Sequence, residues 1–166
     1  MRLRPLAVAL LLPFAFTACL EGTDYSTNVA PNIPIEQTTF ASTLNVNLAA
    51  STKTASGLYL RDITVGTGDV ATSTSTVSVY YAGYLSNGQL FDSRSSPSAP
   101  FGPLKLGVNA VIKGWDEGLV GMKVGGKRQL IIPPTLAYGP AGYGAIPSNA
   151  VLVFTVELVA VAPPAE

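Results

Sequence analysis

The residues that could carry chemistry in this chain are few, because the sequence has no histidine and only one cysteine, Cys19. Catalytic triads and Cys–His pairs use an imidazole as general base, and zinc sites draw most of their ligands from His and Cys. We therefore expect no metal ion, no cofactor and no covalent intermediate. Catalysis would have to rely on the shape of a pocket, aromatic rings, hydroxyls, carboxylates and backbone N–H groups.

Asp116 and Glu117 form an adjacent carboxylate pair that could suggest acid–base catalysis. Neighbouring residues on a helix point about 100° apart, so the two carboxylates do not face a common target. We interpret the pair as part of a solvated helix face.

Length and composition indicate one folded domain with flanking segments. The chain has 166 residues, of which 48% are apolar and 12% charged, a balance typical of folded proteins. Ten basic and ten acidic residues leave a net charge of zero. Because no basic stripe is available to neutralise phosphates, we expect no nucleic-acid partner.

The strands that must position a site can be predicted from the period of the apolar residues. Residues 76–81 alternate with the two-residue period of a strand, and further strands are expected at 129–132 and 152–158. Asn87-Gly88 lies between apolar runs and predicts a tight hairpin.

One stretch has a helical period instead. Between residues 109 and 122 the apolar side chains recur at spacings of three and four, which places them on one helix face. Gly114 and Gly118 weaken this helix, and Gly121 is expected to end it. The prediction is an α+β domain in which antiparallel strands surround one short helix.

The first 18 residues have the pattern of a secretory signal peptide. Two arginines precede an apolar run over residues 6–18, which is too short to span a bilayer. The run ends at Ala18, directly before Cys19, and resembles a bacterial lipobox. We expect removal of residues 1–18 and lipidation of Cys19, with a buried free thiol as the alternative. Leu20, in place of Asp, is typical of lipoproteins sorted to the outer membrane, facing the periplasm.

Residues 19–54 are expected to form the lipidated cysteine and a flexible tether, because they are rich in Ser, Thr, Asn and Ala. About 35 flexible residues would reach roughly 30–35 Å. Some of its residues are too apolar for a linker and are candidates to dock on the domain as a strand or short helix: Phe40, Leu44, Val46 and Leu48. The domain is expected at 55–162, followed by a short tail at 163–166.

Segments spread over residues 57–161 match the motifs of one protein family in order and spacing. They are VYYAGYL (79–85), NG (87–88), FDS (91–93), VIKGWDEGL (111–119), AYG (137–139), IP (146–147) and LVFTVEL (152–158). Together they resemble the FKBP-type peptidyl-prolyl cis/trans isomerases. That family folds as an antiparallel β-sheet wrapped around one short α-helix, in agreement with the elements predicted above.

The resemblance implies an apolar pocket between helix and sheet, with Trp115 as its floor. The residues that would line its walls and rim are Tyr81, Phe91, Phe101, Val111, Ile112, Ile146 and Phe154. The Ile112 N–H and the Tyr138 hydroxyl would hold substrate carbonyls, and Asp92 would hydrogen-bond the Tyr81 hydroxyl. Aromatic residues such as these are ordinary core in an arbitrary domain, but the family register favours a site.

The implied activity is cis/trans isomerisation of X–Pro bonds in unfolded or exported polypeptides by a monomer that macrolides of the family would inhibit. Two alternatives stay open. One is an FKBP-like binding module or chaperone with little turnover, and the other is an envelope lipoprotein that only packs against partners. No inserted flap is evident between Leu136 and Phe154, which favours the plain enzyme.

The chain departs from the family pattern at two places. Many members carry a basic residue five positions after the equivalent of Asp92, where this chain has Pro97, so Arg94 is the remaining candidate partner. We otherwise expect Arg94 and Lys113 to be solvated. The loop over 140–146 is one residue shorter than in common relatives, with Tyr143 near its tip. These departures leave inhibitor affinity and sequence preference open.

Overall fold

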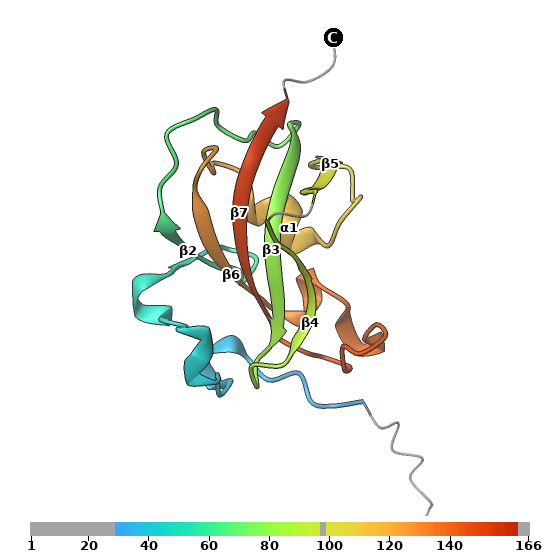
Figure 1. Cartoon of the computed structure of the whole chain (residues 1–166). Helices are drawn as coiled ribbons and strands as arrows, with labels where there is room; N and C mark the ends of the chain where they lie inside the picture. The colour runs from blue at the N-terminus through green and yellow to red at the C-terminus, as the bar shows by residue number, and fades with distance from the viewer. Residues whose placement is uncertain (1–28, 97–98, 163–166) are drawn as a thin grey trace, which may run out of the picture.

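The computed structural model describes residues 29–96 and 99–162, in which an antiparallel sheet wraps around a short α-helix (Figure 1). The strands are β1 Thr52–Lys53, β2 Tyr59–Thr64, β3 Thr76–Leu85, β4 Leu90–Arg94, β5 Phe101–Lys105, β6 Lys127–Ile132 and β7 Leu152–Ala162. They follow the order β1-β2-β6-β7-β3-β4, and β5 pairs with β3. The predicted fold class is confirmed. The predicted signal peptide, Cys19 and the tail at 163–166 lie outside the described residues.

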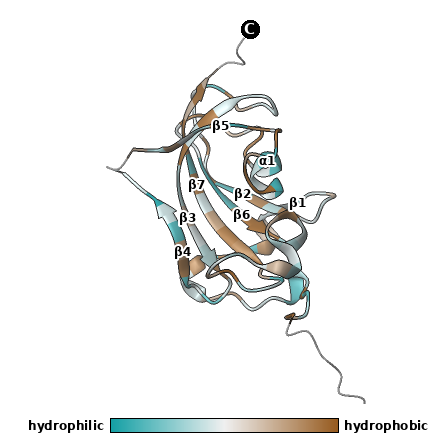
Figure 2. Cartoon of the chain, turned by 90° about the vertical axis from the view of Figure 1, so that its right-hand side faces the viewer, coloured by the Kyte–Doolittle hydropathy of each residue, from teal (hydrophilic) through white to brown (hydrophobic). Residues whose placement is uncertain are grey.

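The two long central strands have the burial pattern that the sequence predicts. On β3, buried and half-buried residues alternate along the whole strand. Its buried apolar residues and Leu152, Phe154, Val156 and Leu158 of β7 pack with the helix α1, Lys113–Gly118, into the main core. Figure 2 shows α1 beside one face of the sheet. The β3–β4 hairpin turns at Asn87-Gly88, where Gly88 has a φ of 89°.

The helix is held close to the sheet by its two glycines, which the sequence pattern presents only as weak points. A Cβ on Gly114 would lie 2.5 Å from Cγ2 of Ile132, and one on Gly118 would lie 2.7 Å from Cδ2 of Leu130. Any larger residue would push α1 away from β6. The helix ends at Gly118, earlier than the predicted end at Gly121.

Apolar side chains between Ile35 and Leu48 pack on the sheet, and Ala30 forms hydrogen bonds with Ser148 and Asn149. The prediction of a flexible tether is therefore wrong for residues 29–50. We call them the N-terminal strap. They include three 3₁₀ turns, η1 Ile35–Gln37, η2 Ser42–Leu44 and η3 Leu48–Ala50. The four apolar candidates do dock, in and around these turns and not as a strand or α-helix. The strap forms a second core against the sheet, whose members are Ile35, Phe40, Ala41, Leu44, Val46, Leu48, Tyr59, Tyr84, Ile131, Val151 and Val153.

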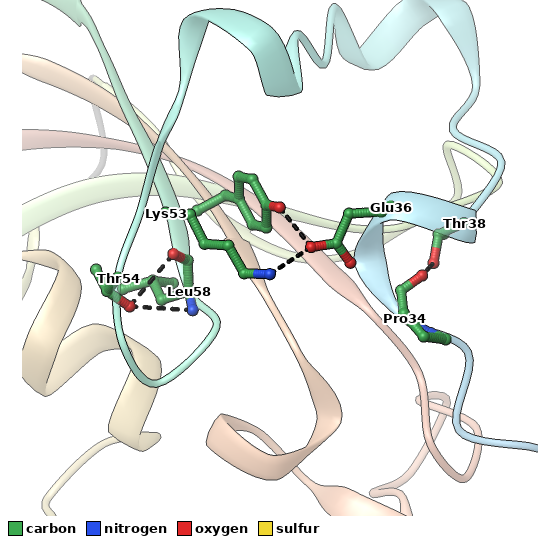
Figure 3. A network of polar contacts seen from close by, with 7 residues as sticks. Pro34, Glu36, Thr38, Lys53, Thr54 and Leu58 are labelled. Atoms are coloured by element: carbon green, nitrogen blue, oxygen red, sulfur yellow. Dashed lines mark hydrogen bonds and ion pairs between the residues drawn. The ribbon is translucent and has the colours of Figure 1, made fainter.

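Polar contacts fix the strap as well. Lys53 Nζ lies 2.5 Å from Oε1 of Glu36, and the Tyr59 hydroxyl donates to the same oxygen over 2.6 Å (Figure 3). The hydrogen bond from Lys53 and then that from Tyr59 lower the pKa of Glu36 to about 2. The buried side chain of Gln129 donates to the Leu44 carbonyl over 2.8 Å. The folded unit therefore begins well before residue 55.

Two further 3₁₀ turns, η4 Pro134–Leu136 and η5 Gly139–Ala141, follow β6. The second turn lies within residues 138–150, which we call the rim loop. None of the helices in the described ranges combines the length and the apolar character needed to cross a bilayer.

Candidate active site

A pocket of about 190 Å³ lies between α1, the central strands and the rim loop. Its lining consists of Tyr81, Phe91, Asp92, Phe101, Ala110, Val111, Ile112, Trp115, Tyr138 and Phe154. The structure thus brings together every pocket residue predicted from the sequence except Ile146. Ala110 is an addition that no motif marks, because a small residue before the helix carries no chemical signal of its own.

Trp115 lies at the centre of the aromatic lining. Its ring contacts Tyr81 at a centroid distance of 5.1 Å, Phe154 at 5.3 Å and Phe101 at 6.2 Å, each in an edge-to-face arrangement. Edge-to-face pairs at these distances are favourable for aromatic quadrupoles. Only 4% of Trp115 is exposed, as expected for a pocket floor that the surrounding rings hold in place.

The ring of Phe154 connects the floor to the wall on β4. It packs edge to face against Phe91, with centroids 5.5 Å apart. Gly83, opposite Phe154 in the β3–β7 register, leaves room for both rings, because a Cβ there would lie 2.5 Å from Phe154 Cε1.

The hydrogen bond expected between Tyr81 and Asp92 is present. The Tyr81 hydroxyl donates to Oδ2 of Asp92 over 2.6 Å. Burial, followed by this bond to a carboxylate, raises the pKa of Tyr81 above its ordinary value. Burial also raises the pKa of Tyr138. Both phenols therefore stay protonated, and able to donate, throughout the neutral pH range.

Ile112 brings a backbone donor to the pocket. It is the N-cap of α1, with extended φ and ψ of −60° and 145°, and its carbonyl accepts from Trp115 N–H over 2.9 Å. The hydrogen bonds formed among the described residues include none from the Ile112 N–H. A pocket-lining N–H without an intramolecular acceptor is available to a ligand carbonyl.

Asp116 and Glu117 correct the prediction of a solvated helix face, because both are half-buried and bound. The Asp116 carboxylate accepts from the backbone N–H groups of Gly107 and Asn109, over 3.0 and 3.1 Å. Glu117 accepts from the Ser56 hydroxyl. Asp116 thereby holds the segment that leads into Ala110 and Ile112, a role that the sequence did not signal.

Ile146, predicted at the rim, is not among the residues that line the pocket itself and lies next to it. It lines a neighbouring groove of about 220 Å³ together with Phe91, Asp92, Tyr138, Tyr143, Gly144 and Ala145. The ring of Tyr143 stacks on that of Tyr138, with centroids 5.3 Å apart and planes 14° from parallel. Because Phe91, Asp92 and Tyr138 line both cavities, the groove continues the pocket.

The remaining charged candidates take no part in this site. Lys113 and Arg94 are exposed, as predicted. The ion pairs of the described residues do not include one between Arg94 and Asp92. Within residues 29–96 and 99–162, no three His, Cys, Asp or Glu side chains gather as metal ligands.

Comparisons with known proteins agree with this geometry. Residues 68–159 match a protein family described as FKBP-type peptidyl-prolyl cis-trans isomerase. The chain is 47% identical to an FK506-binding protein of Neisseria meningitidis over 106 residues, which cover 63% of this chain and 96% of that protein. It is 50% identical to FK506-binding protein 4 of Dictyostelium discoideum, over 64% of this chain and 29% of that protein.

Solved structures with the same fold include FkpA from Escherichia coli, with a TM-score of 0.62 and 40% identity. That match covers 70% of this chain and 53% of FkpA. AtFKBP13 matches with a TM-score of 0.60 and 39% identity, over 68% of this chain and 98% of the other. The chain spans about a quarter of the length of several curated relatives and nearly all of the neisserial one.

Proposed function

Because the chain belongs to the family of FKBP-type peptidyl-prolyl cis-trans isomerases, we propose that it catalyses cis/trans isomerisation of X–Pro bonds in the pocket above Trp115. The observation that carries this proposal is the pocket itself, a small cavity lined mainly by aromatic and aliphatic side chains, with Asp92 as the charged residue of its lining. Its volume of about 190 Å³ is below the roughly 300–1,000 Å³ of sites for drug-sized ligands. It suits a single ring such as that of proline.

An apolar pocket can accelerate this reaction without covalent chemistry. Rotation about the X–Pro amide breaks its resonance and is slow, taking tens to hundreds of seconds without a catalyst. The planar amide is polar and well hydrated at its carbonyl, whereas the half-rotated amide has lost resonance and is less polar. Transfer from water into an apolar cavity therefore destabilises the planar form more. Each difference of about 1.4 kcal/mol raises the rate tenfold.

Donors at the edge of the pocket would add to this effect. The Ile112 N–H has no acceptor among the described residues, and the Tyr138 phenol remains protonated at neutral pH. Each can donate to a substrate carbonyl, and a donor placed for the rotated carbonyl stabilises the transition state selectively. The Tyr81 hydroxyl donates a hydrogen bond to Asp92 on β4. This bond holds the Tyr81 ring in the wall of the pocket.

The experiment that tests the proposal measures prolyl isomerisation in a proline-containing peptide with the purified full chain. We expect acceleration that FK506 abolishes, because relatives of the chain are FK506-binding proteins. A chain that binds unfolded polypeptides equally well with and without FK506, and gives no acceleration, would instead be the binding module.

We further propose that the protein acts on exported polypeptides from a membrane anchor at Cys19. The support is the signal-like run that ends directly before the only cysteine of the chain. With lipid attached there, the strap begins ten residues after the anchor, at Val29. The domain would then stay within about 35 Å of the outer membrane. In a bacterial host, Cys19→Ser should release the protein from the membrane fraction, and an unchanged distribution would rule out the anchor.

A further inference from the structure

The N-terminal strap contacts the base of the rim loop. The N–H of Ala30 donates to Oγ of Ser148 over 3.0 Å, and the side-chain amide of Asn149 donates to the Ala30 carbonyl over 2.5 Å. The backbone N–H of Asn149 donates to the Gly139 carbonyl over 2.8 Å. One residue, Asn149, therefore joins the strap to the point where the loop closes.

The strap also contacts the turn between β3 and β4. The N–H of Ala41 donates to the Ser86 carbonyl over 2.9 Å. A Cβ on Gly88 would lie 3.1 Å from Cβ of Ala41 and 3.2 Å from Oγ1 of Thr43. The strap is thus in close contact with the turn from which β4 starts.

Between these two contacts, the strap, the turn and the rim loop border a cleft of about 250 Å³. The strap itself is fixed, because Ile35 and Leu44 are buried against the sheet and Gln129 binds the Leu44 carbonyl. It thereby contacts two elements, the β3–β4 turn and the base of the rim loop.

Those two elements carry the opposite sides of the groove next to the pocket. Phe91 and Asp92 belong to β4, whereas Tyr138, Tyr143 and Ile146 belong to the rim loop. In a peptide whose proline fills the pocket, the Cα atom of the residue before proline is about 3.8 Å from that of the proline when the bond is trans. Because the groove shares Phe91, Asp92 and Tyr138 with the pocket, it is within reach of the side chain of that residue.

We propose that the strap sets the width of this groove and thereby selects which side chain is accepted before proline. The inference rests on the proposed isomerase function. Ser148 and Asn149 are positioning residues in it, because they act on the substrate through the rim loop. Loss of their contacts with Ala30 frees the loop to move relative to β4.

The test compares the full chain with a Ser148→Ala/Asn149→Gly double variant. Asn149 has a φ of 52°, which glycine adopts without strain, so Asn149→Gly removes the side-chain amide without straining the backbone. Ser51→Ala is the matched control. It removes a serine hydrogen bond of 2.7 Å to the Asn47 carbonyl, at the other end of the strap.

The first readout is kcat/KM for peptides with Ala, Leu or Phe before proline. We expect the Phe-to-Ala ratio to change at least about threefold in the double variant, as for the loss of one modest hydrogen bond. The ratio should stay unchanged in Ser51→Ala and in Ser148→Thr, which keeps the hydroxyl. If the two residues only stabilised the fold, kcat/KM would fall by the same factor for all three peptides. An unchanged Phe-to-Ala ratio in an active double variant therefore overturns the proposal.

The second readout is the rate of amide hydrogen exchange at the tip of the rim loop. There the Tyr143 N–H donates to the Ile146 carbonyl over 2.9 Å, and the Ile146 N–H donates to the Tyr143 carbonyl over 2.8 Å. Exchange of these amides should be faster in the double variant and unchanged in Ser51→Ala. Equal exchange rates overturn the proposal whatever the activity. If the parent chain is inactive in the peptide assay, the proposed isomerase function is overturned, and the proposed selectivity with it. Whether the strap orders the rim loop is decided by the hydrogen-exchange rates alone.

Discussion

The hydroxyl of Tyr81 lies 2.6 Å from Oδ2 of Asp92 and joins two neighbouring strands at the edge of the pocket. Tyr81 is on β3, is buried, and packs against Trp115. Asp92 is on β4 and exposed to solvent. The bond therefore ties the exposed carboxylate on β4 to a ring on β3 that packs against the pocket floor, and keeps both at the pocket wall.

Replacing Tyr81 by phenylalanine removes the hydroxyl and keeps the ring, so it measures the contribution of the hydroxyl alone. We expect Tyr81→Phe to lower the free energy of unfolding by about 1–2 kcal/mol, because a hydrogen bond to a charged group is lost. It should also lower kcat/KM several-fold. Tyr80→Phe is the control, since Tyr80 is on the same strand and its hydroxyl makes no side-chain bond among the described residues. Equal effects of the two variants in peptide assays and urea titrations would contradict this role.

The main core and most of the pocket could be predicted from the sequence because their signals are periodic or belong to motifs. Alternation along residues 76–81 predicts β3, and the spacing around Trp115 predicts the helix that carries it. Both signals are local. They predict the structure correctly because the apolar residues that create the period are the ones that pack in the core.

The sequence marked four apolar residues of the strap as candidates to dock, but it could not predict the conformation of the strap or the bound carboxylates, because these depend on distant partners. Phe40 and Leu44 have no period of their own, and they become core only where Ile131 and Val153 meet them. Asp116 is an ordinary helical acid until the Gly107 and Asn109 amides turn toward it. Ile146 matches the motif but lines the neighbouring groove, since the motif does not fix how the rim loop folds beside the pocket.

Replacing Phe154 by another large apolar residue should impair catalysis more than it impairs stability. Phe154→Leu keeps an apolar residue on β7 but loses the edge-to-face contacts with Trp115 and Phe91. We expect a loss of at least about tenfold in kcat/KM, which corresponds to roughly 1.4 kcal/mol of transition-state stabilisation.

The control for Phe154→Leu is Leu158→Ala, on the same strand and buried, but outside the pocket. It should destabilise the fold by about 2–5 kcal/mol and leave kcat/KM of the folded protein unchanged. Calorimetry together with the peptide assay distinguishes the two variants. A tenfold loss in Leu158→Ala would mean that catalysis only follows stability.

Gly114 should be intolerant of any side chain as long as Ile132 faces it. In Gly114→Ala the new Cβ would meet Cγ2 of Ile132 at 2.5 Å, and overpacking of this kind costs about 1–3 kcal/mol. Adding Ile132→Ala opens the space, so the double variant should be more stable than the sum of the two single changes predicts. Urea unfolding of the four proteins measures this coupling. Strict additivity would show that the contact is absent.

Acid should weaken the strap through Glu36. Its pKa is lowered from 4.5 to about 2, first by the hydrogen bond from Lys53 and then by that from Tyr59. Between these two values the unfolded chain binds more protons at this group than the folded chain. The stability that the group contributes is therefore present above about pH 4.5 and lost as the pH falls toward 2.

We expect Glu36→Gln to show a smaller drop in its urea midpoint between pH 6 and pH 3 than the parent does, and the difference to shrink in 1 M salt, where the Debye length is about 3 Å. Both partners are partly solvated, with Lys53 53% and Glu36 45% exposed, so screening should be effective. Identical pH profiles for parent and variant would contradict the assignment.

Tyr143 should act on catalysis through the ring of Tyr138. The rings stack at 5.3 Å, and Tyr143 is 70% exposed, so Tyr143→Ala removes the stack with little loss of buried surface. Aromatic pairs are worth about 0.5–1.5 kcal/mol. If that energy holds the Tyr138 hydroxyl in place, kcat/KM should fall about two- to tenfold. Tyr143→Phe, which keeps the ring, should retain the parental value in the same peptide assay. Equal losses in both variants would show that the Tyr143 hydroxyl, and not the stacked ring, supports the site.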